Sequence, residues 1–287
     1  MKNKYFVFGL RPYYKCIKLD VSSCKLFYIC LMHKLSIITI CFNNLADLKA
    51  TCASVDSQIA KPFEHIIING STTNEIENWL DSLPNPDYRL VFNEKDEGIS
   101  DAFNKGIKKA HGDVVHILNS GDLYYNDKVV SVIMKVFDEN NILSWVSGKI
   151  KIKRAGIWVL IGVPFDKKQL YKGMRAISHP TWFLKKDVYN RIGLYSKAYK
   201  IGMDYDLLCR LKNEPYTFIN EPLVHFDDNG ISTNDYKKSL RENILIYESN
   251  FGFSLKSRLW QFRLFLFDLI LKTNFGRWLY KIKTALV

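Results

Sequence analysis

Short apolar runs alternate with amphipathic stretches from residue 35 to residue 141. Four runs have the length and the β-branched content of buried strands: LSIITICF (35–42), EHIII (64–68), YRLVF (88–92) and DVVHIL (113–118). Stretches with helical spacing follow the first, third and fourth runs and end near residues 60, 110 and 141. This alternation predicts an α/β fold with a Rossmann-like, mostly parallel central sheet and helices on both faces.

Beyond Leu143 the alternation becomes looser. Residues 144–163 have a hairpin-like pattern, and residues 199–211 end in a predicted helix. The sequence contains no internal repeat and no linker long enough to separate independent domains. We therefore predict one main domain over residues 35–230, an N-terminal extension over residues 1–34, and a region of amphipathic helices over residues 231–287.

Polar residues follow all four predicted strands. Ligands of such sheets bind beyond the carboxyl ends of the strands, so these four stretches are the candidate site: Asn43 with Asn44, Asn69–Thr72, Asn93–Asp101 and Asn119–Asp122. Neither a GxGxxG motif after the first strand nor a GxxxxGK[ST] motif is present. A phosphate-bearing ligand would have to be held in another way, most simply through a metal ion.

Asp122 ends the LNSGD segment after the fourth strand. A hard divalent ion that bridges a diphosphate needs only one or two protein carboxylates, because phosphate oxygens and water complete its coordination. Asp122 is therefore a candidate metal ligand. The alternative is a turn in which Asp122 caps the next helix.

Two further residues are candidates for proton transfer or acceptor binding. Asp204 lies at the start of a helix predicted from about Tyr205, where it is either a general base or an N-cap. On the same helix, Asp206 precedes Arg210 by four residues and can pair with it. His179 precedes Pro180, which favours an extended backbone, and it either contacts substrate or has no role.

The positive charge lies at the two ends of the chain. The net charge is 41 − 29 = +12, and residues 1–34 and 254–287 carry 7 − 1 = +6 each, so residues 35–253 are neutral with 27 charges of each sign. A nucleic-acid-binding protein would carry this excess on its folded domain, so we expect no nucleic-acid partner. The six cysteines form no CxxC pair, which indicates buried free thiols in a reducing, cytoplasmic compartment.

Taken in order, these segments resemble the family 2 glycosyltransferases with the GT-A fold, of the colanic-acid type that builds bacterial surface polysaccharides. The resemblance covers about residues 35–230. It depends on these segments: LSIITICFNN, IIINGST, NEKDEGISDAFNKGIKKAHGD, HILNSGD, SHPTWFLKKDVYNRIG and YKIGMDYDLLCRL. The run from Glu94 to Asp122 is long and more specific than any single motif.

The resemblance implies a role for each candidate residue. It assigns nucleotide-sugar binding to residues at the strand ends and on the helix after the third strand: Thr39, Cys41, Asn43, Asn69, Glu94, Asp96, Asp101, Asn104 and Asn119. It implies that Asp122 is the metal ligand, Asp204 the catalytic base and His179 the acceptor-side histidine. The sequence departs from the family at Asn69 and Asn119, which replace common aspartates, and at Met203, which replaces a glutamate.

The implied activity is inverting, hexosyltransferase-like transfer from a nucleoside-diphosphate sugar, with Mn²⁺ or Mg²⁺ as cofactor. The implied acceptor is a saccharide linked to a polyprenyl diphosphate, and the implied pathway is the synthesis of cell-surface polysaccharide. A degenerate protein that serves as a nucleotide-sugar-binding or assembly scaffold is the alternative, because of the departures at Asn69, Asn119 and Met203. A nucleotidyltransferase would need a glycine-rich basic loop, which ICFNNLADLK does not provide.

The two basic ends have separate interpretations. Residues 254–287 mix aromatic and basic side chains, which favours a helix in the headgroup region of an anionic membrane; a helix packed on the main domain is the alternative. We thus expect a cytoplasmic protein that is peripheral at the inner face of the cell membrane. Residues 1–31 either precede a true start at Met32 or form a second membrane contact.

Overall fold

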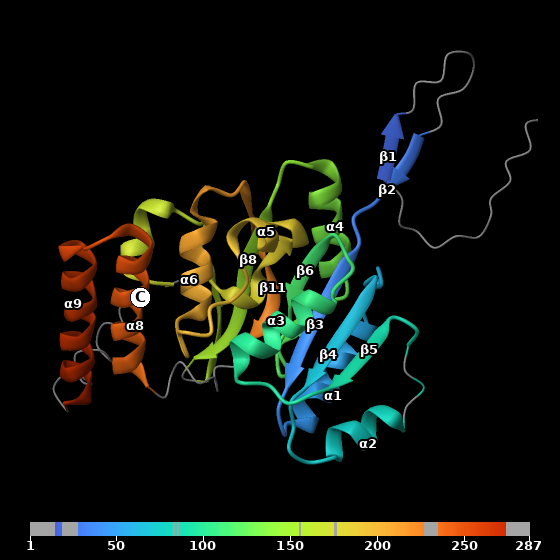
Figure 1. Ribbon diagram of the computed structural model, residues 1–287, viewed down its shortest axis with the longest axis horizontal. Helices are drawn as coiled ribbons and strands as arrows, with labels where there is room; N and C mark the ends of the chain where they lie inside the picture. The colour runs from blue at the N-terminus through green and yellow to red at the C-terminus, as the bar shows by residue number, and fades with distance from the viewer. Residues whose placement is uncertain are drawn as a thin grey trace, which may run out of the picture.

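The computed structural model describes residues 15–18, 28–82, 84, 86–154, 156–174, 177–226 and 235–273. Most of the predicted extension over residues 1–34 lies outside this part of the chain, as does the C-terminal stretch 274–287. Within the extension, β1 (Lys15–Lys18) pairs antiparallel with β2 (Tyr28–Leu31), and this pair lies beyond the N-terminal end of β3 (Figure 1).

Four parallel strands form one half of the main sheet. They are β3 (Leu35–Cys41), β4 (Glu64–Asn69), β5 (Arg89–Asn93) and β6 (Val114–Ile117), in the spatial order β5-β4-β3-β6. All four coincide with predicted strands. Their carboxyl ends therefore lie along one edge of the sheet, where the candidate nucleotide-sugar residues follow.

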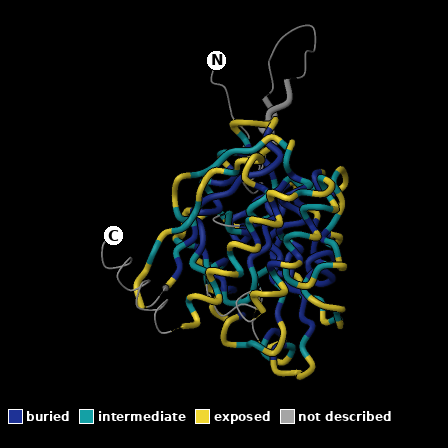
Figure 2. The backbone as a smooth tube through the Cα atoms, turned by 90° about the vertical axis from the view of Figure 1, so that its left-hand side faces the viewer, coloured by how far each residue is buried: buried dark blue, intermediate teal, exposed yellow. Residues whose placement is uncertain are grey.

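Helices cover both faces of this parallel half, as predicted. One face packs on α3 (Ile99–Lys109), where Gly106 lies so close to Ile38 of β3 that a Cβ atom would be 2.3 Å from its side chain. The other face packs on α1 (Leu45–Asp56), α2 (Glu75–Asp81) and α4 (Val129–Glu139). Figure 2 shows the buried backbone inside and the exposed backbone on the surrounding segments.

The other half of the sheet is mixed. Its strands are β10 (Phe183–Lys185), β8 (Trp145–Arg154), β11 (Tyr216–Phe226), β7 (Leu123–Tyr124) and β9 (Ile157–Ile161). β10 pairs antiparallel with β6 and with β8, while β11 is parallel to β8. The hairpin predicted over residues 144–163 is β8 with β9. The sheet and its helices confirm the predicted α/β fold class.

Shorter helices connect the strands of the mixed half of the sheet, and two of them carry His179 and Asp204. They are the 3₁₀ helices η1 (Lys167–Lys172), η2 (His179–Thr181) and η3 (Leu211–Asn213), with α5 (Lys186–Ile192) and α6 (Met203–Arg210). Helices α5 and α6 pack on the same face of the sheet as α3. The Asp206–Arg210 pair expected on α6 is present, with 2.8 Å between Arg210 Nη2 and Asp206 Oδ2.

Two C-terminal helices form the end of the molecule farthest from β5 (Figure 1). α8 (Tyr236–Phe251) packs against α6, and α9 (Leu255–Lys272) packs against α8 and η1. Within the described residues, none of the helices has both the length and the apolar character needed to cross a bilayer. Their contacts with α6 and η1 make α8 and α9 part of the folded body that carries the candidate site.

Candidate active site

Asn69 lies at the centre of the contacts that join the carboxyl ends of β3, β4 and β5. Its amide nitrogen donates to Asn93 Oδ1 at 2.9 Å, and its amide oxygen accepts from the backbone N–H of Ser71 at 3.1 Å. The Cys41 thiol lies 3.6 Å from the same oxygen. Burial raises the pKa of Cys41 to about 12, so this thiol stays protonated and acts as a weak donor.

Asn43 fixes the loop after β3 against the loop after β4. Its backbone is left-handed, with φ of 53°, a conformation that asparagine tolerates better than most residues. The Asn43 amide donates to Thr72 Oγ1 at 3.1 Å and accepts from the Thr72 backbone N–H at 3.1 Å. Two of the four polar stretches predicted to form the site are therefore joined directly.

Thr39 lies within β3 and is fully buried. Its hydroxyl donates to the Leu118 carbonyl at 2.8 Å and contacts His65 Nε2 at 2.9 Å. Burial lowers the pKa of His65 to about 3, so this imidazole is neutral. The Thr39 side chain thus ties β3 to the end of β6, and its polar atom already has protein partners.

Glu94 and Asp96 lie in the loop that follows β5. Glu94 Oε1 lies 3.3 Å from Lys109 Nζ, and Asp96 Oδ1 accepts from the Gly98 backbone N–H at 2.9 Å. Asp96 also approaches the end of β4 so closely that a Cβ atom on Gly70 would be 2.1 Å from its Oδ2. Glycine at position 70 is therefore what allows the Asp96 carboxylate to reach the strand ends.

Asp101 lies in the first turn of α3 and is held by two lysines. Lys197 Nζ lies 2.5 Å from Asp101 Oδ1, and Lys105 Nζ lies 3.2 Å from Oδ2. Chiefly because of the bond from Lys197, the pKa of Asp101 is lowered to about 2. The ionised carboxylate therefore connects α3 to the segment that precedes α6.

The Asn119–Asp122 turn follows β6. Gly121 has φ of 102°, which favours glycine, and the Thr51 hydroxyl of α1 donates to the Asp122 carbonyl at 2.9 Å. Asp122 is 4% exposed, and the N-cap position of the following helix α4 belongs to Lys128. Asp122 is therefore not the cap of that helix, which was the alternative interpretation of its sequence position.

The residues of this turn fit a divalent cation that arrives with a diphosphate. Among the described hydrogen bonds, the buried oxygens Asn119 Oδ1 and Ser120 Oγ have no partner. They lie in the same turn as the Asp122 carboxylate, so the turn offers only oxygen donors, which hard cations prefer. In the described part of the chain, no three His, Cys, Asp or Glu side chains cluster as metal ligands. Phosphate oxygens would have to complete the coordination.

Asp204 and His179 lie close together, on α6 and η2. His179 Nε2 is 3.7 Å from Asp204 Oδ1, and this oxygen has no hydrogen-bond partner among the described residues. Burial raises the pKa of Asp204 to about 7, although 27% of its side chain is exposed, and it lowers the pKa of His179 to about 3. Gly202 is the N-cap of α6, so Asp204 is not a cap and its carboxylate remains available as a base.

A chain of contacts leads from α3 to this pair. Asn104 donates to the Tyr195 carbonyl at 2.8 Å and accepts from its backbone N–H at 2.9 Å. The Tyr195 hydroxyl is 2.7 Å from His179 Nε2, and Phe103 stacks on the His179 ring with centroids 5.6 Å apart. Asn104 therefore helps to position His179, with both its amide atoms engaged by Tyr195.

His116 positions η2 from the opposite side. Its Nε2 donates to the Pro180 carbonyl at 2.9 Å, and its Nδ1 accepts from the Tyr124 hydroxyl at 2.8 Å. Burial lowers the pKa of His116 to about 3, which keeps the ring neutral for this pattern of bonds. The backbone next to His179 is therefore fixed by β6.

The structure thus brings seven of the twelve sequence-predicted residues into two groups. Cys41, Asn43, Asn69 and Asp96 meet at the strand ends, and Asn104, His179 and Asp204 meet between α3, η2 and α6. Sequence reasoning missed Tyr195 of the second group. It also missed Glu242 of α8, which accepts from the backbone N–H of Gly202 at 2.8 Å. Neither residue lies in a local motif, so only covariation with its distant partner could have indicated it.

The chain is similar to several glycosyltransferases of known sequence. A family model described as "Glycosyl transferase family 2" matches residues 36–193, more than half of the chain. A glycosyltransferase of Mycobacterium tuberculosis is 29% identical over 202 residues, which cover 69% of this chain and 76% of that protein. A PGL/p-HBAD biosynthesis glycosyltransferase of Mycobacterium bovis is 27% identical over 184 residues, with coverages of 63% and 70%.

Two solved structures show the same fold at low sequence identity. Mannosyltransferase PcManGT from Pyrobaculum calidifontis, in complex with GDP-Man and Mn²⁺, has a TM-score of 0.54 and 12% identity, and covers 89% of this chain and 80% of its own. S. aureus TarS 1-349 has a TM-score of 0.53 and 16% identity over 75% of this chain; the match spans less than two thirds (65%) of that chain. The GT-A fold is confirmed, and this chain belongs to glycosyl transferase family 2.

Proposed function

We propose that this protein is an inverting, metal-dependent hexosyltransferase-like enzyme of cell-surface polysaccharide biosynthesis. It transfers a sugar from a nucleoside-diphosphate sugar to a saccharide carried on a polyprenyl diphosphate. The observation that carries the proposal is the Asp204 carboxylate, which has one unpaired oxygen, a pKa raised to about 7 and an opening into a pocket of about 280 Å³. A base with this pKa accepts a proton efficiently near neutral pH.

The chemical step follows from the position of Asp204. An acceptor hydroxyl gives its proton to the Asp204 carboxylate, while its oxygen forms a bond to the anomeric carbon of the donor sugar. The bond from that carbon to the diphosphate oxygen breaks, and its electron pair leaves with the nucleoside diphosphate. Because one displacement occurs from the opposite face, the stereochemistry is inverted. The neutral His179 beside Asp204 orients the acceptor.

The donor side uses the strand-end residues and the Asn119–Asp122 turn. Asn43, Asn69 and Asp96 would bind the nucleoside, and Asp122 with Asn119 Oδ1 would hold Mn²⁺ or Mg²⁺. When bound, the cation neutralises charge on the leaving diphosphate. Support comes from the structural neighbours, since TarS was solved in complex with UDP-GlcNAc and PcManGT in complex with GDP-Man and Mn²⁺.

The α9 helix supports a peripheral position on an anionic membrane. Its fully buried residues are polar, Ser257 and Gln261, whereas apolar side chains on the outside are about half exposed: Leu259, Phe262, Leu266, Phe267 and Ile270. A helix on a water-facing surface has the opposite arrangement. The outer surface of α9 therefore suits the apolar layer of a membrane, at whose inner, cytoplasmic face a polyprenyl-linked acceptor is held.

A transfer assay tests the catalytic proposal. The full chain is incubated with a panel of sugar nucleotides and a polyprenyl-diphosphate saccharide, with Mn²⁺ or with EDTA. Wild-type protein should transfer one sugar, and Asp204→Asn should lower the rate by at least about a thousandfold. The exposed Asp187, which pairs with Arg191 on α5, provides the matched control Asp187→Asn. Metal-independent binding of sugar nucleotide without transfer or hydrolysis of any donor would instead establish the scaffold alternative.

A second assay tests the membrane proposal. Vesicles that contain anionic lipid are sedimented with wild-type protein and with Phe262→Ser/Leu266→Ser, in which two exposed apolar side chains of α9 are replaced. We expect at least tenfold weaker vesicle binding for this variant. Ile142→Ser removes a comparably exposed apolar residue, 77% exposed and distant from α9, and should bind as wild type does. Equal binding of all three proteins would refute the proposal.

A further inference from the structure

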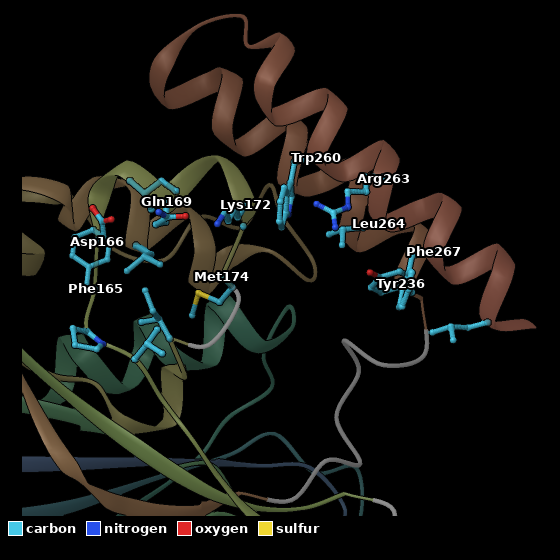
Figure 3. A pocket seen from close by; sticks show the side chains of 17 residues that line it. Phe165, Asp166, Gln169, Lys172, Met174, Tyr236, Trp260, Arg263, Leu264 and Phe267 are labelled. Carbon is cyan, nitrogen blue, oxygen red and sulfur yellow. The ribbon is translucent and has the colours of Figure 1, made fainter. Parts of the chain in front are cut away.

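A groove of about 860 Å³ lies between η1, the segment that follows it, and α9 (Figure 3). It adjoins the pocket of about 280 Å³ that contains Asp204. Four residues line both spaces, namely Lys172, Met174, Tyr236 and Leu264. A ligand that fills the groove would therefore reach the catalytic base without leaving the surface of the protein. The volume lies within the range of pockets that bind extended organic ligands.

The lining of the groove is mainly apolar. Phe165, Leu170 and Ile177 contribute from the main domain, while Leu264, Phe267 and Leu271 contribute from α9. Hydroxyl groups of a saccharide would lose hydrogen bonds to water against such walls, whereas a hydrocarbon chain would gain from burial there. Phe267 lines the groove and is also 49% exposed, so the groove continues onto the apolar outer surface of α9.

Two cations face the groove from opposite walls. Lys172 Nζ is 4.9 Å from the centre of the Trp260 ring, and Arg263 Cζ is 5.3 Å from the centre of the same ring (Figure 3). In the described part of the chain, neither cation forms an ion pair with a carboxylate. The acidic side chain in the lining, Asp166, instead caps η1 by accepting from the Lys168 N–H. Two cations that lack a carboxylate partner favour the binding of an anionic ligand in the groove.

Three features of the groove match one class of ligand. Apolar side chains line it on both sides of Trp260, with Phe165 and Met174 on one side and Phe267 on the other (Figure 3). The two cations lie at Trp260, and Lys172 also lines the pocket that contains Asp204. A lipid diphosphate that carries a sugar combines the same three chemistries, because its hydrocarbon chain is joined to the diphosphate and the diphosphate to the saccharide.

We infer that the groove is the acceptor-lipid site. The isoprenoid chain packs between Leu170 and Leu264, the diphosphate binds Lys172 and Arg263, and the saccharide places its hydroxyl at Asp204. This inference rests on the proposed glycosyltransferase function and assigns residues to its acceptor. It makes α9 part of substrate binding as well as of membrane contact.

Calorimetric titration of the full chain with farnesyl diphosphate tests the site, in EDTA and without donor, so that neither metal nor chemistry contributes. Wild-type protein should bind this probe at least tenfold more tightly than either farnesol or inorganic diphosphate. Lys172→Ala/Arg263→Ala should weaken binding at least tenfold, and so should Leu264→Asp, which places a charge in the apolar wall. Thermal unfolding of each variant confirms that it is folded.

Matched controls change the same residue types outside the groove. Arg241→Ala removes an exposed arginine of α8, and Leu245→Asp places a charge at an exposed leucine of the same helix; neither residue lines the groove. Both variants should bind farnesyl diphosphate as wild type does. The inference is overturned if wild-type protein does not bind the probe, if inorganic diphosphate binds equally well, or if the controls weaken binding as much as the groove variants.

A parallel measurement separates this inference from the proposed function. Hydrolysis of a sugar nucleotide in the presence of Mn²⁺ reports on the donor site alone and needs no acceptor lipid. Donor hydrolysis without binding of farnesyl diphosphate overturns the groove assignment and leaves the glycosyltransferase proposal standing. Binding of farnesyl diphosphate without hydrolysis or transfer of any donor overturns the glycosyltransferase proposal and leaves the groove standing as a lipid-diphosphate site.

Discussion

Glu242 of α8 accepts a hydrogen bond from the backbone N–H of Gly202, the N-cap of α6, at 2.8 Å. The same carboxylate accepts from Ile201 N–H at 2.9 Å and from Lys200 N–H at 3.3 Å. No side chain of α6 itself caps the helix, so α8 supplies the negative group that its N-terminus requires. Asp204 follows Gly202 by two residues, and the C-terminal helices therefore help to determine where the proposed catalytic base lies.

Replacing Glu242 should impair catalysis through the position of Asp204. In Glu242→Ala, three backbone N–H groups lose their acceptor, of which that of Gly202 is buried, and we expect about 2 kcal/mol lower stability and at least about tenfold lower kcat. The KM for the sugar nucleotide should stay unchanged, because the donor residues lie on other elements. Steady-state kinetics and urea unfolding measure the two effects.

Glu242→Gln should recover part of the lost kcat, since its amide oxygen can still accept. Glu139→Ala, which removes a glutamate with 66% of its side chain exposed on α4, is the matched control and should behave as wild type does. An increase in the donor KM equal to the loss of kcat would contradict a positioning role for Glu242.

The sequence predicted the strands and helices that depend on local patterns. The run at 35–42 became β3 (Leu35–Cys41), because a parallel strand buried on both faces needs an unbroken apolar run. The Asp206–Arg210 pair followed from helical spacing alone. By contrast, β10 (Phe183–Lys185) has only three residues, too few for a recognisable pattern, and it joins the two halves of the sheet.

The parts of the site that escaped prediction depend on partners far apart in the chain. Asn104 and Tyr195 are 91 positions apart, and Gly202 and Glu242 are 40 apart. The predicted start of α6 near Tyr205 was late, because Glu242 caps the helix at Gly202 and allows it to begin at Met203. The predicted nucleotide-binding roles all stay predictions, and Thr39 is the candidate whose hydroxyl is bonded inside the sheet.

The rate of sugar transfer should rise with pH through a midpoint near 7. Only ionised Asp204 can accept the proton, and burial raises its pKa to about 7, so the base is inactive at lower pH. The pKa of His179 is lowered to about 3, so this imidazole stays neutral across the range and does not add a second inflection to the pH–rate profile. Single-turnover rates from about pH 5.5 to about pH 9 measure the profile.

Asp204→Glu provides the comparison, because it keeps a carboxylate but changes its position and burial. Its profile should retain a rising limb with a different midpoint and a lower plateau. A pH-independent rate for wild-type protein over this range would rule out Asp204 as the titrating base.

Asp204→Asn should stabilise the protein, and more so as the pH rises. The pKa of Asp204 increases on folding from 3.8 to about 7, so its contribution to stability is fully present below 3.8 and is lost as the pH rises through 7. The neutral amide carries no such penalty. Its Tm relative to wild type should therefore increase between pH 5 and pH 8, by about 4 °C or more.

Differential scanning calorimetry at several pH values measures this difference. Asp187→Asn, at an exposed position, should show no comparable dependence on pH. A constant offset between Asp204→Asn and wild type across the range would mean that the folded protein does not raise the pKa of Asp204.

Asp122 should determine the affinity for the divalent cation. Asp122 and Asn119 lie in one turn, and Asn119 Oδ1 has no other described partner, so removal of the Asp122 charge leaves only neutral oxygen donors. Asp122→Asn should raise the Mn²⁺ concentration for half-maximal activity by at least about tenfold. Mn²⁺ binding in the presence of UDP or GDP, followed by electron paramagnetic resonance, should weaken to a similar degree.

Asp127→Asn, at an exposed aspartate beyond the same turn, is the control and should bind as wild type does. Because this control removes the same charge from the same region, loss of Mn²⁺ binding in both variants would indicate a general electrostatic effect in place of coordination by Asp122.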